Sequence, residues 1–442
     1  MPTKLFLQNA RVVDPQSGLD EVLDLIICHG RIVALGQDLK PKDPTESSSG
    51  AAPCEYYDLA GQVIMPGLFD MHVHLREPGY EYKGDIASES KAALKGGFTD
   101  ILAMPNTSPA CDNGEVVKFV IDKAAEVAPI RVHVCGALTK GEQGEALAEM
   151  GDMFASGACA FSDDGRGVQD AGQMRRAMDY ARQFGCPVLS HCQDEGLAGV
   201  GQVNEGACST LLGLAGWPAA AEEIQIGRDI ALCRLTGEAL HVQHVSSAHG
   251  LALVGAAKAE GLPVTCEVTP HHLFLCEEDI DKTYPTNLKV NPPLRTRADM
   301  EALQEALCSG QIDCIATDHA PHAQHEKQME FELAPFGTTG LETALSLLYT
   351  ELIEPGRLSW ASLVNHYAVR PRQILGQAPL RIAEGEPANL TVFNPRPTWT
   401  VSRTDFVSKA SNSAFLGRQL KGQVSQVFVD GQWRLRDGLP CA

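Results

Sequence analysis

The sequence predicts an α/β protein, in which a (β/α)8 TIM barrel is flanked by a small β-sandwich formed by both chain termini. Between residues 62 and 379, short apolar segments alternate with amphipathic helical patterns. At both ends of the chain, apolar and polar residues alternate instead. Strands that are apolar almost throughout are typical of a parallel sheet covered by helices, and eight such segments favour a closed barrel.

Residues 1–61 are expected to form the N-terminal part of the β-sandwich. LFLQNARVVD (5–14) and DLIICHGRIVALG (24–36) alternate as half-buried strands do, and the pair His29–Gly30 predicts a turn. The segment 40–53 is rich in Pro, Ser and Gly. This composition predicts a flexible surface loop without a function of its own.

Residues 62–379 are expected to form the barrel. Helical patterns at 85–97, 114–127, 171–185 and 297–310 separate its strands, and several end in Gly, which is preferred at helix C-caps. The predicted strands are VIMPGLFDMHVHL (63–75), TDILAMPN (99–106), IRVHVCGAL (130–138), ACAFSDD (158–164), PVLSHC (187–192), ALHVQHV (239–245), PVTCEVTPHHL (263–273) and DCIATDHAP (313–321).

Residues 380–442 are expected to complete the β-sandwich. ANLTVFNP (388–395), TWTVS (398–402) and SQVFVDGQWRLRDG (425–438) return to the β pattern. The VDGQW segment within the last of these is a hairpin signal, because an Asp-Gly pair favours a tight turn between strands.

Composition limits the partners of the chain. Its net charge of -20 disfavours nucleic acid and anionic lipid, and it also means that a small anionic substrate needs a local cationic pocket. The 14 cysteines include no CxxC pair, which is typical of reduced thiols in a cytoplasmic protein. The first residues do not resemble a signal peptide, and no apolar segment approaches the roughly 18 residues of a membrane helix.

Ionisable residues gather at the C-terminal ends of the predicted strands, where barrel enzymes place their active sites. Each has an ordinary structural alternative, such as a core histidine or a capping carboxylate, but five separate strand ends would each need that explanation. Imidazole with carboxylate suits zinc or a similar divalent ion. The set has more ligands than one tetrahedral site can use, and it fits two metals about 3.5–4 Å apart. Its members are His72, His74, Asp163, Asp164, His191, His244 and Asp318.

The motifs around these residues resemble those of dihydroorotases, within the amidohydrolase superfamily. DMHVHLREPG (70–79) and ATDHAPHAQHEK (316–327) resemble the two signature segments. Eight further segments match the family in the expected order, so the likeness covers about residues 4–437. They are AMPNT, CAFSDDGRGV, SHCQD, QHVSS, CEVTPHHL, KVNPPLR, FGTTGLETAL and SNSAFLG.

The resemblance implies two zinc ions per chain. It implies that His72, His74 and Asp318 bind one ion, that His191 and His244 bind the other, and that Asp164 bridges them. Many relatives use a carboxylated lysine as the bridge. The fourth strand here offers only Asp163 and Asp164, as in one bacterial branch, and the preference for Asp164 depends on the resemblance.

The resemblance also implies the reversible hydrolysis of dihydroorotate to N-carbamoyl-L-aspartate, the third step of de novo pyrimidine synthesis. Asp318 would be the catalytic residue that moves the proton. Arg76, Asn106 and His322 would hold the substrate carboxylate, for which the forked donors of arginine are suited. Asn291 and the backbone of Gly337 would contact the ring.

Two alternatives remain open. One is another cyclic amidohydrolase, such as a hydantoinase or an allantoinase, although these usually carry the bridging lysine and lack an arginine at the position of Arg76. The other is a non-catalytic scaffold for a transcarbamoylase, which the full ligand set disfavours. The resemblance further implies a homodimer or an association with aspartate transcarbamoylase.

The remaining candidates are interpreted as structural. Cys192 is expected to be a core thiol because no base is evident beside it. The long polar segment 323–337 is either a lid or an inert loop. We expect His271 and His272 to fix strand-end geometry, His319 to point away from Asp318, and His133, His241, His249, His325 and His366 to be structural or exposed.

Overall fold

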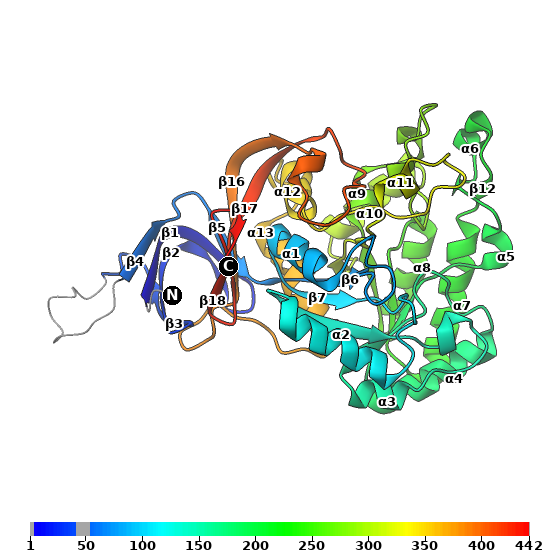
Figure 1. Ribbon diagram of the computed structural model, residues 1–442, viewed down its shortest axis with the longest axis horizontal. Coiled ribbons are helices and arrows are strands. Elements are labelled where there is room, and N and C mark those ends of the chain that lie inside the picture. Colours follow the sequence, from blue (N-terminus) through cyan, green and yellow to red (C-terminus); the bar gives the residue numbers. More distant parts are fainter. Residues whose placement is uncertain (1–3, 41–53, 442) are drawn as a thin grey trace.

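The computed structural model describes residues 4–40 and 54–441 of the chain. A barrel lies beside a smaller part that is built from both ends of the chain (Figure 1). The predicted loop at 40–53 therefore falls outside the described residues, apart from Lys40. Across the described ranges, no helix is both long enough and apolar enough to span a membrane.

Eight parallel strands form the barrel in sequence order, and each predicted strand segment overlaps one of them. The last strand meets the first, because the backbone N–H of His74 donates to the carbonyl of His319 at 2.9 Å. The sheet thus closes, which confirms the predicted (β/α)8 barrel. Its strands are β6 (Leu68–Val73), β7 (Phe98–Ala103), β8 (Arg131–Gly136), β9 (Ala158–Phe161), β10 (Val188–Ser190), β13 (Leu240–Val242), β14 (Val264–Val268) and β15 (Cys314–Ile315).

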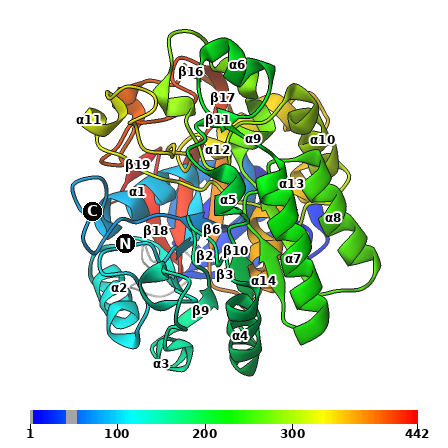
Figure 2. The ribbon, with the colours of Figure 1, turned by 90° about the vertical axis from the view of Figure 1, so that its right-hand side faces the viewer.

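Helices surround these strands (Figure 2). The main ones are α1 (Ile86–Gly96), α2 (Gly114–Val127), α3 (Met150–Ala155), α4 (Ala171–Ala181), α7 (Ala220–Thr236), α8 (Ala248–Ala259), α10 (Arg297–Cys308), α12 (Ala344–Leu348), α13 (Trp360–Val364) and α14 (Arg370–Ile374). Shorter elements lie in the connections: α5 (Glu195–Ala198), β11 (Val203–Asn204), α6 (Ala207–Leu212), β12 (Gly216–Trp217), α9 (Pro270–Phe274) and α11 (Gln324–Lys327).

Local signals in the sequence set the ends of these helices. Asp85 caps α1 by accepting from the backbone N–H of Ser88, and Gly97 ends that helix with φ of 94°. Asp170 caps α4 in the same way, by accepting from Gln173. A side-chain acceptor at the start and a left-handed glycine at the end satisfy backbone groups that the helix itself leaves free.

The terminal part is one sheet of nine strands. β5 joins the two ends of the chain, because it pairs with β1 on one side and with β16 on the other. This confirms that both termini fold together. The strands are β1 (Lys4–Asp14), β2 (Leu19–Cys28), β3 (Arg31–Gly36), β4 (Cys54–Asp58), β5 (Val63–Pro66), β16 (Leu390–Thr400), β17 (Gln419–Val429), β18 (Gln432–Arg436) and β19 (Leu439–Pro440).

This sheet curls over its own core, so that its two halves face each other. The rings of Tyr57 on β4 and Trp433 on β18 lie 4.7 Å apart, although the two strands are distant within the sheet. Two hairpin turns also meet, since a Cβ added to Gly431 would lie 2.2 Å from the carbonyl oxygen of Gly30. Asp430 and Gly431 both have positive φ, as the tight turn predicted at VDGQW requires.

An ion cluster with a buried centre at Asp100 and Arg372 ties the barrel to this sheet. Asp100 on β7 accepts from the guanidinium groups of Arg131 and Arg372. Arg131 also donates to Asp430, in the hairpin between β17 and β18, at 2.6 Å. A polar contact therefore joins the N-terminal end of the barrel strands to the terminal sheet.

Candidate metal centre

The residues proposed as metal ligands all lie at the C-terminal end of the barrel strands. His72 belongs to β6, and His74 follows it on the same face. The other ligands follow further strands: Asp164 after β9, His191 after β10, His244 after β13 and Asp318 after β15. Because parallel strands end at the same mouth of a barrel, five sequence-distant segments converge there. All six side chains are buried.

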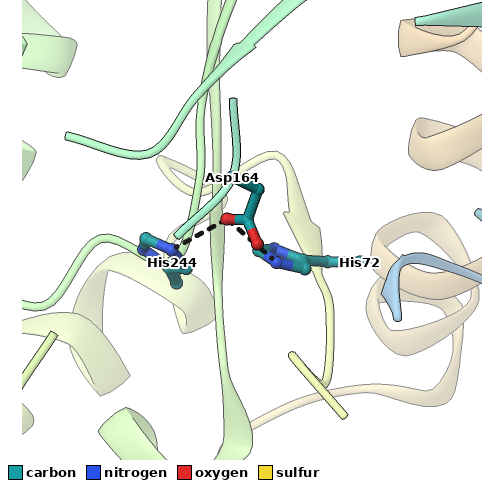
Figure 3. A group of neighbouring side chains, drawn as sticks. All are labelled: His72, Asp164 and His244. Carbon is teal, nitrogen blue, oxygen red and sulfur yellow. Dashed lines mark ion pairs between the residues drawn. The ribbon is translucent and has the colours of Figure 1, made fainter. Parts of the chain in front are cut away.

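The Asp164 carboxylate is at the centre of this group. Its Oδ1 lies 3.4 Å from His72 Nε2, 3.4 Å from His191 Nδ1 and 3.7 Å from His244 Nε2. Its Oδ2 lies 3.4 Å from His74 Nε2. Figure 3 shows Asp164 between His72 and His244, which come from opposite sides. This carboxylate can therefore contact two ions at once.

The remaining ligands divide into two sets around Asp164. In the first set, Asp318 Oδ1 lies 2.9 Å from His74 Nε2 and 3.5 Å from His72 Nε2. In the second set, His191 Nδ1 lies 2.8 Å from His244 Nε2. Because His72 also lies within reach of Asp164 and His244, the division that the family resemblance implies stays a prediction.

Unpaired atoms in this cluster fit a cationic ligand. His72 Nε2 and Asp164 Oδ1 are buried and have no hydrogen-bond partner. An unsatisfied buried polar atom is costly, and nearly all such atoms find partners in folded proteins. Ring nitrogens and carboxylate oxygens within a few ångströms of one another are the donors that zinc prefers. The chain therefore has the donors and the geometry for a divalent ion.

Three residues of the site have left-handed backbone, which non-glycine residues rarely adopt. Their φ angles are 67° for Arg76, 33° for His244 and 46° for Asp318. Each such conformation costs about 1–3 kcal/mol and is concentrated at functional sites. The backbone strain thus coincides with the proposed site.

A pocket of about 240 Å³ opens onto the ligands. Every substrate residue implied by the resemblance lines it, namely Arg76, Asn106, Asn291, His322 and Gly337. His72 alone of the ligands lies beneath it, in contact with Asp164 and Asp318. The structure thus brings together every predicted site residue.

Arg76 and His322 lie side by side in this pocket. Arg76 Nε donates to the carbonyl of Pro321 at 3.1 Å, while a terminal guanidinium nitrogen lies 3.3 Å from His322 Nε2. His322 Nε2 also lies 2.8 Å from the carbonyl of Phe336, to which it must donate its proton. It cannot then accept from Arg76, so this guanidinium nitrogen remains available for an anionic ligand.

Other polar side chains contact the ligands, and for two of them, Glu267 and Gln193, the sequence predicted no role. Glu267 Oε1 lies 2.6 Å from His72 Nδ1, and Gln193 Oε1 lies 2.8 Å from His191 Nε2. Gln193 also accepts from Asn291, whereas Asn106 Oδ1 contacts His74 Nδ1 at 2.9 Å. Glu267 and Gln193 occur in the motifs CEVTPHHL and SHCQD, where a polar residue in or beside an apolar strand was the available signal.

The other histidines are placed largely as expected. His319 points away from Asp318 and contacts Glu89 at 2.8 Å. His272 contacts the Thr269 hydroxyl and the Pro292 carbonyl, whereas His271 Nε2 is buried without a partner. Three more histidines have structural partners: His133 contacts Asp100, His241 contacts Glu267, and His366 contacts the Asp313 carbonyl. The last two, His249 and His325, are exposed.

Cys192 and the segment 323–337 are both held by their surroundings. Cys192 is buried, and burial raises the pKa of its thiol well above the usual value, as expected of a core thiol. The segment is tied down by two lysines. Lys327 Nζ donates to the carbonyls of Thr286 and Pro335, and Lys289 Nζ donates to those of Phe331 and Glu332. The end of the segment, at Phe336 and Gly337, lines the pocket.

Known proteins resemble the chain in both sequence and fold. Residues 61–250 match a family described as dihydro-orotase-like. The chain is 45% identical over 435 residues to a protein of Pelotomaculum thermopropionicum named dihydroorotase, covering 98% of this chain and 99% of the relative. A protein of Geobacter metallireducens with the same name is also 45% identical, covering 97% and 98%.

Solved structures share the fold. The L-hydantoinase (dihydropyrimidinase) of Arthrobacter aurescens superimposes with a TM-score of 0.86 at 24% identity, covering 99% of this chain and 97% of that one. The D-hydantoinase (dihydropyrimidinase) of a Thermus species has a TM-score of 0.81 at 25% identity, covering 99% and 96%. The barrel and the terminal sheet both lie within these matches. With relatives of 45% identity along nearly its whole length, the chain belongs to the dihydroorotase family of cyclic amidohydrolases.

Proposed function

We propose that this protein hydrolyses the ring amide of dihydroorotate reversibly, giving N-carbamoyl-L-aspartate, as the third step of de novo pyrimidine synthesis. The observation that carries the proposal is the guanidinium of the half-buried Arg76, which shares one pocket with the metal-ligand cluster. A carboxylate on the substrate ring can meet Arg76 while the ring amide faces the ligands. The relatives named dihydroorotase support the same substrate.

The enzyme family depends on metal, and we assign two zinc ions to this chain. His72, His74 and Asp318 would hold one, His191 and His244 the other, and Asp164 would bridge them. Bound in this way, such ions lower the pKa of a water molecule and polarise the amide carbonyl. The histidine and carboxylate donors favour zinc, but they also suit other divalent ions.

The side chains around the ligands divide the remaining work. Arg76, Asn106 and His322 hold the substrate carboxylate, and Asn291 and the backbone of Gly337 contact the ring. This fixes the amide carbon beside the ligand cluster, where orientation itself accelerates the reaction. Asp318 lies in the same pocket and accepts the proton of the attacking water. It then delivers this proton to the ring nitrogen as that bond breaks.

A turnover assay with dihydroorotate, hydantoin and allantoin side by side tests the proposal, with metal analysis on the same sample. We expect turnover of dihydroorotate to exceed that of the other two rings, which lack its carboxylate. Preferential turnover of hydantoin or allantoin would replace the assignment with another cyclic amidohydrolase. A protein that holds metal but turns over none of the three would instead support the scaffold alternative.

The setting of the enzyme is part of the proposal. All 14 cysteines are free, which supports a reducing compartment such as the cytoplasm. The net charge of -20 supports a small-molecule substrate rather than a nucleic acid or membrane partner. A homodimer or an association with aspartate transcarbamoylase stays a prediction. Light scattering of the purified protein tests the homodimer, and light scattering after aspartate transcarbamoylase is added tests the association.

A further inference from the structure

Glu267 on β14 lies directly beneath the proposed metal ligands and is fully buried. Its Oε1 lies 2.6 Å from Nδ1 of His72 and accepts from the backbone N–H of His244 at 3.3 Å. Its Oε2 lies 3.2 Å from Nε2 of His241. One carboxylate therefore touches a ligand of each proposed ion.

The proton positions along this chain of contacts can be assigned. His72 must keep Nε2 free of a proton in order to bind an ion, so that its Nδ1 carries the proton. An ionised carboxylate only accepts hydrogen bonds, so Glu267 can accept one from this N–H group at 2.6 Å. On the other side, His241 Nε2 must donate to the Glu267 carboxylate, so that His241 Nδ1 accepts from the Thr265 hydroxyl at 2.8 Å.

A second neighbour favours the opposite tautomer of His72. The side-chain nitrogen of Gln243 lies 3.2 Å from the same Nδ1. An amide nitrogen only donates, so this contact becomes a hydrogen bond only if Nδ1 is bare and Nε2 carries the proton. That tautomer cannot bind an ion through Nε2. The contact with Glu267 is shorter and charge-assisted, and it outweighs the amide contact.

We infer that Glu267 is a positioning residue, which holds His72 in its metal-binding tautomer and braces the backbone of His244. The inference rests on the proposed two-metal function and adds a residue to it. Carboxylates behind metal-bound histidines commonly change metal affinity by about 10–100-fold. Here the same carboxylate reaches both halves of the centre, so its loss should affect both ions.

The test compares full-length Glu267→Gln with wild type, using metal binding as the readout. Zinc affinity is measured by competition with a coloured chelator, and ligand geometry by the visible absorption of the Co²⁺-loaded protein. We expect an affinity about 10–100-fold lower and a shifted Co²⁺ spectrum. Glu277→Gln is the matched control, because Glu277 is also buried but its side chain accepts from Asn204, which is not a proposed ligand. It should behave as wild type does.

Wild-type affinity and spectrum in a folded Glu267→Gln protein would overturn the inference, as would an equal loss in Glu277→Gln. If Glu267→Gln does not fold, Glu267→Asp keeps the charge but withdraws the carboxylate by one methylene. Glu267→Asp should also weaken zinc binding. Unchanged zinc binding in this variant would contradict the inference. Wild-type protein that binds metal without turning over dihydroorotate would contradict only the proposed function.

Discussion

Asp163 and Asp164 are adjacent in the chain, yet their carboxylates have different surroundings. Asp163 Oδ1 accepts from the backbone N–H groups of Leu138 at 2.8 Å and Thr139 at 3.0 Å, and its Oδ2 accepts from the Thr139 hydroxyl. Asp164 faces the four histidines. Burial raises the pKa of Asp163 to about 6 against these hydrogen bonds. Burial opposes the ionisation of Asp164, but attraction to His72 and the nearby ring nitrogens of His191 and His244 outweigh burial and lower the pKa well below its usual value.

The two aspartates should therefore respond differently to the same substitution. Asp164→Asn should lose most of its bound metal, because a bridging carboxylate becomes a neutral amide. Asp163→Asn should keep its metal and show a lower melting temperature, since one of its two acceptor oxygens becomes an amide nitrogen, which cannot accept from the Thr139 hydroxyl. Elemental analysis and thermal melting of both proteins test this. Loss of metal in Asp163→Asn with retention in Asp164→Asn would reverse the assignment.

The metal content of wild type is a separate prediction. Protein that has never met a chelator should carry close to two divalent ions per chain, because the ligands form two sets around one shared carboxylate. Elemental analysis against a protein concentration from amino-acid analysis measures this. One ion per chain would overturn the bridging role of Asp164, and none would overturn the metal centre.

Asp318 should be needed for the chemical step. Asp318→Ala is expected to lower kcat by about 10²–10⁴-fold or more, because it removes the proton acceptor and a metal ligand together. Asp318→Asn, with its metal content measured in parallel, separates the two losses. A variant that retains two ions but has lost kcat identifies the proton-transfer role. Activity near that of wild type in either variant would exclude it.

The barrel was predictable because its signals are local. The apolar strands are short and end in polar residues, and helix ends such as Asp85 and Gly97 carry their own caps. The strands within 63–75 were harder to predict, because residues 63–69 form one apolar stretch across the boundary between two strands. Pro66 and Gly67 divide it into β5, which pairs in the terminal sheet, and β6, which opens the barrel. That pairing depends on residues more than 300 positions away, which periodicity does not report.

The same limit applies within the site. The ligands stand at strand ends, where position alone marks them. The function of Glu267 depends on His72, which lies two strands away only in the closed barrel, and the two are 195 residues apart. The contact of Arg76 with the Pro321 carbonyl is likewise set by barrel closure. Residue type and spacing can thus identify groups that face the pocket, whereas supporting contacts require the closed fold.

The Asp100 cluster should make stability depend on pH. Burial opposes the ionisation of Asp100, but attraction to Arg372 and hydrogen bonds from His133 and Arg131 lower its pKa far below the usual value. A lowered folded-state pKa contributes stability that is complete above the unfolded pKa of about 3.9 and is lost as pH falls below it.

Asp100→Asn should therefore lower the unfolding free energy at pH 7 by about 3–5 kcal/mol, because Arg372 is left buried without its partner. The difference from wild type should be about 1 kcal/mol smaller at pH 3. Urea titrations at both pH values, followed by circular dichroism and fluorescence together, measure it. A difference that does not change with pH would mean that the carboxylate contributes by packing alone.

Arg76 should determine specificity for a carboxylated ring. Dihydroorotate differs from hydantoin in carrying a carboxylate on the ring, and a net charge of -20 disfavours that anion unless a local cation offsets it. Arg76→Met changes no proposed ligand, so the protein should keep its metal. It should lose about 2–5 kcal/mol in kcat/KM for dihydroorotate, as expected when one partner of a desolvated charge pair is removed. Detectable activity on a ring without the carboxylate should be nearly unchanged.

Arg403→Met is the matched control, because exposed Arg403 lines the neighbouring cavity behind His322 and its loss changes the net charge equally. Its kcat/KM should stay at the wild-type value. An equal loss on both rings in Arg76→Met would mean that Arg76, through its bond to Pro321, supports the shape of the pocket rather than the recognition of the carboxylate.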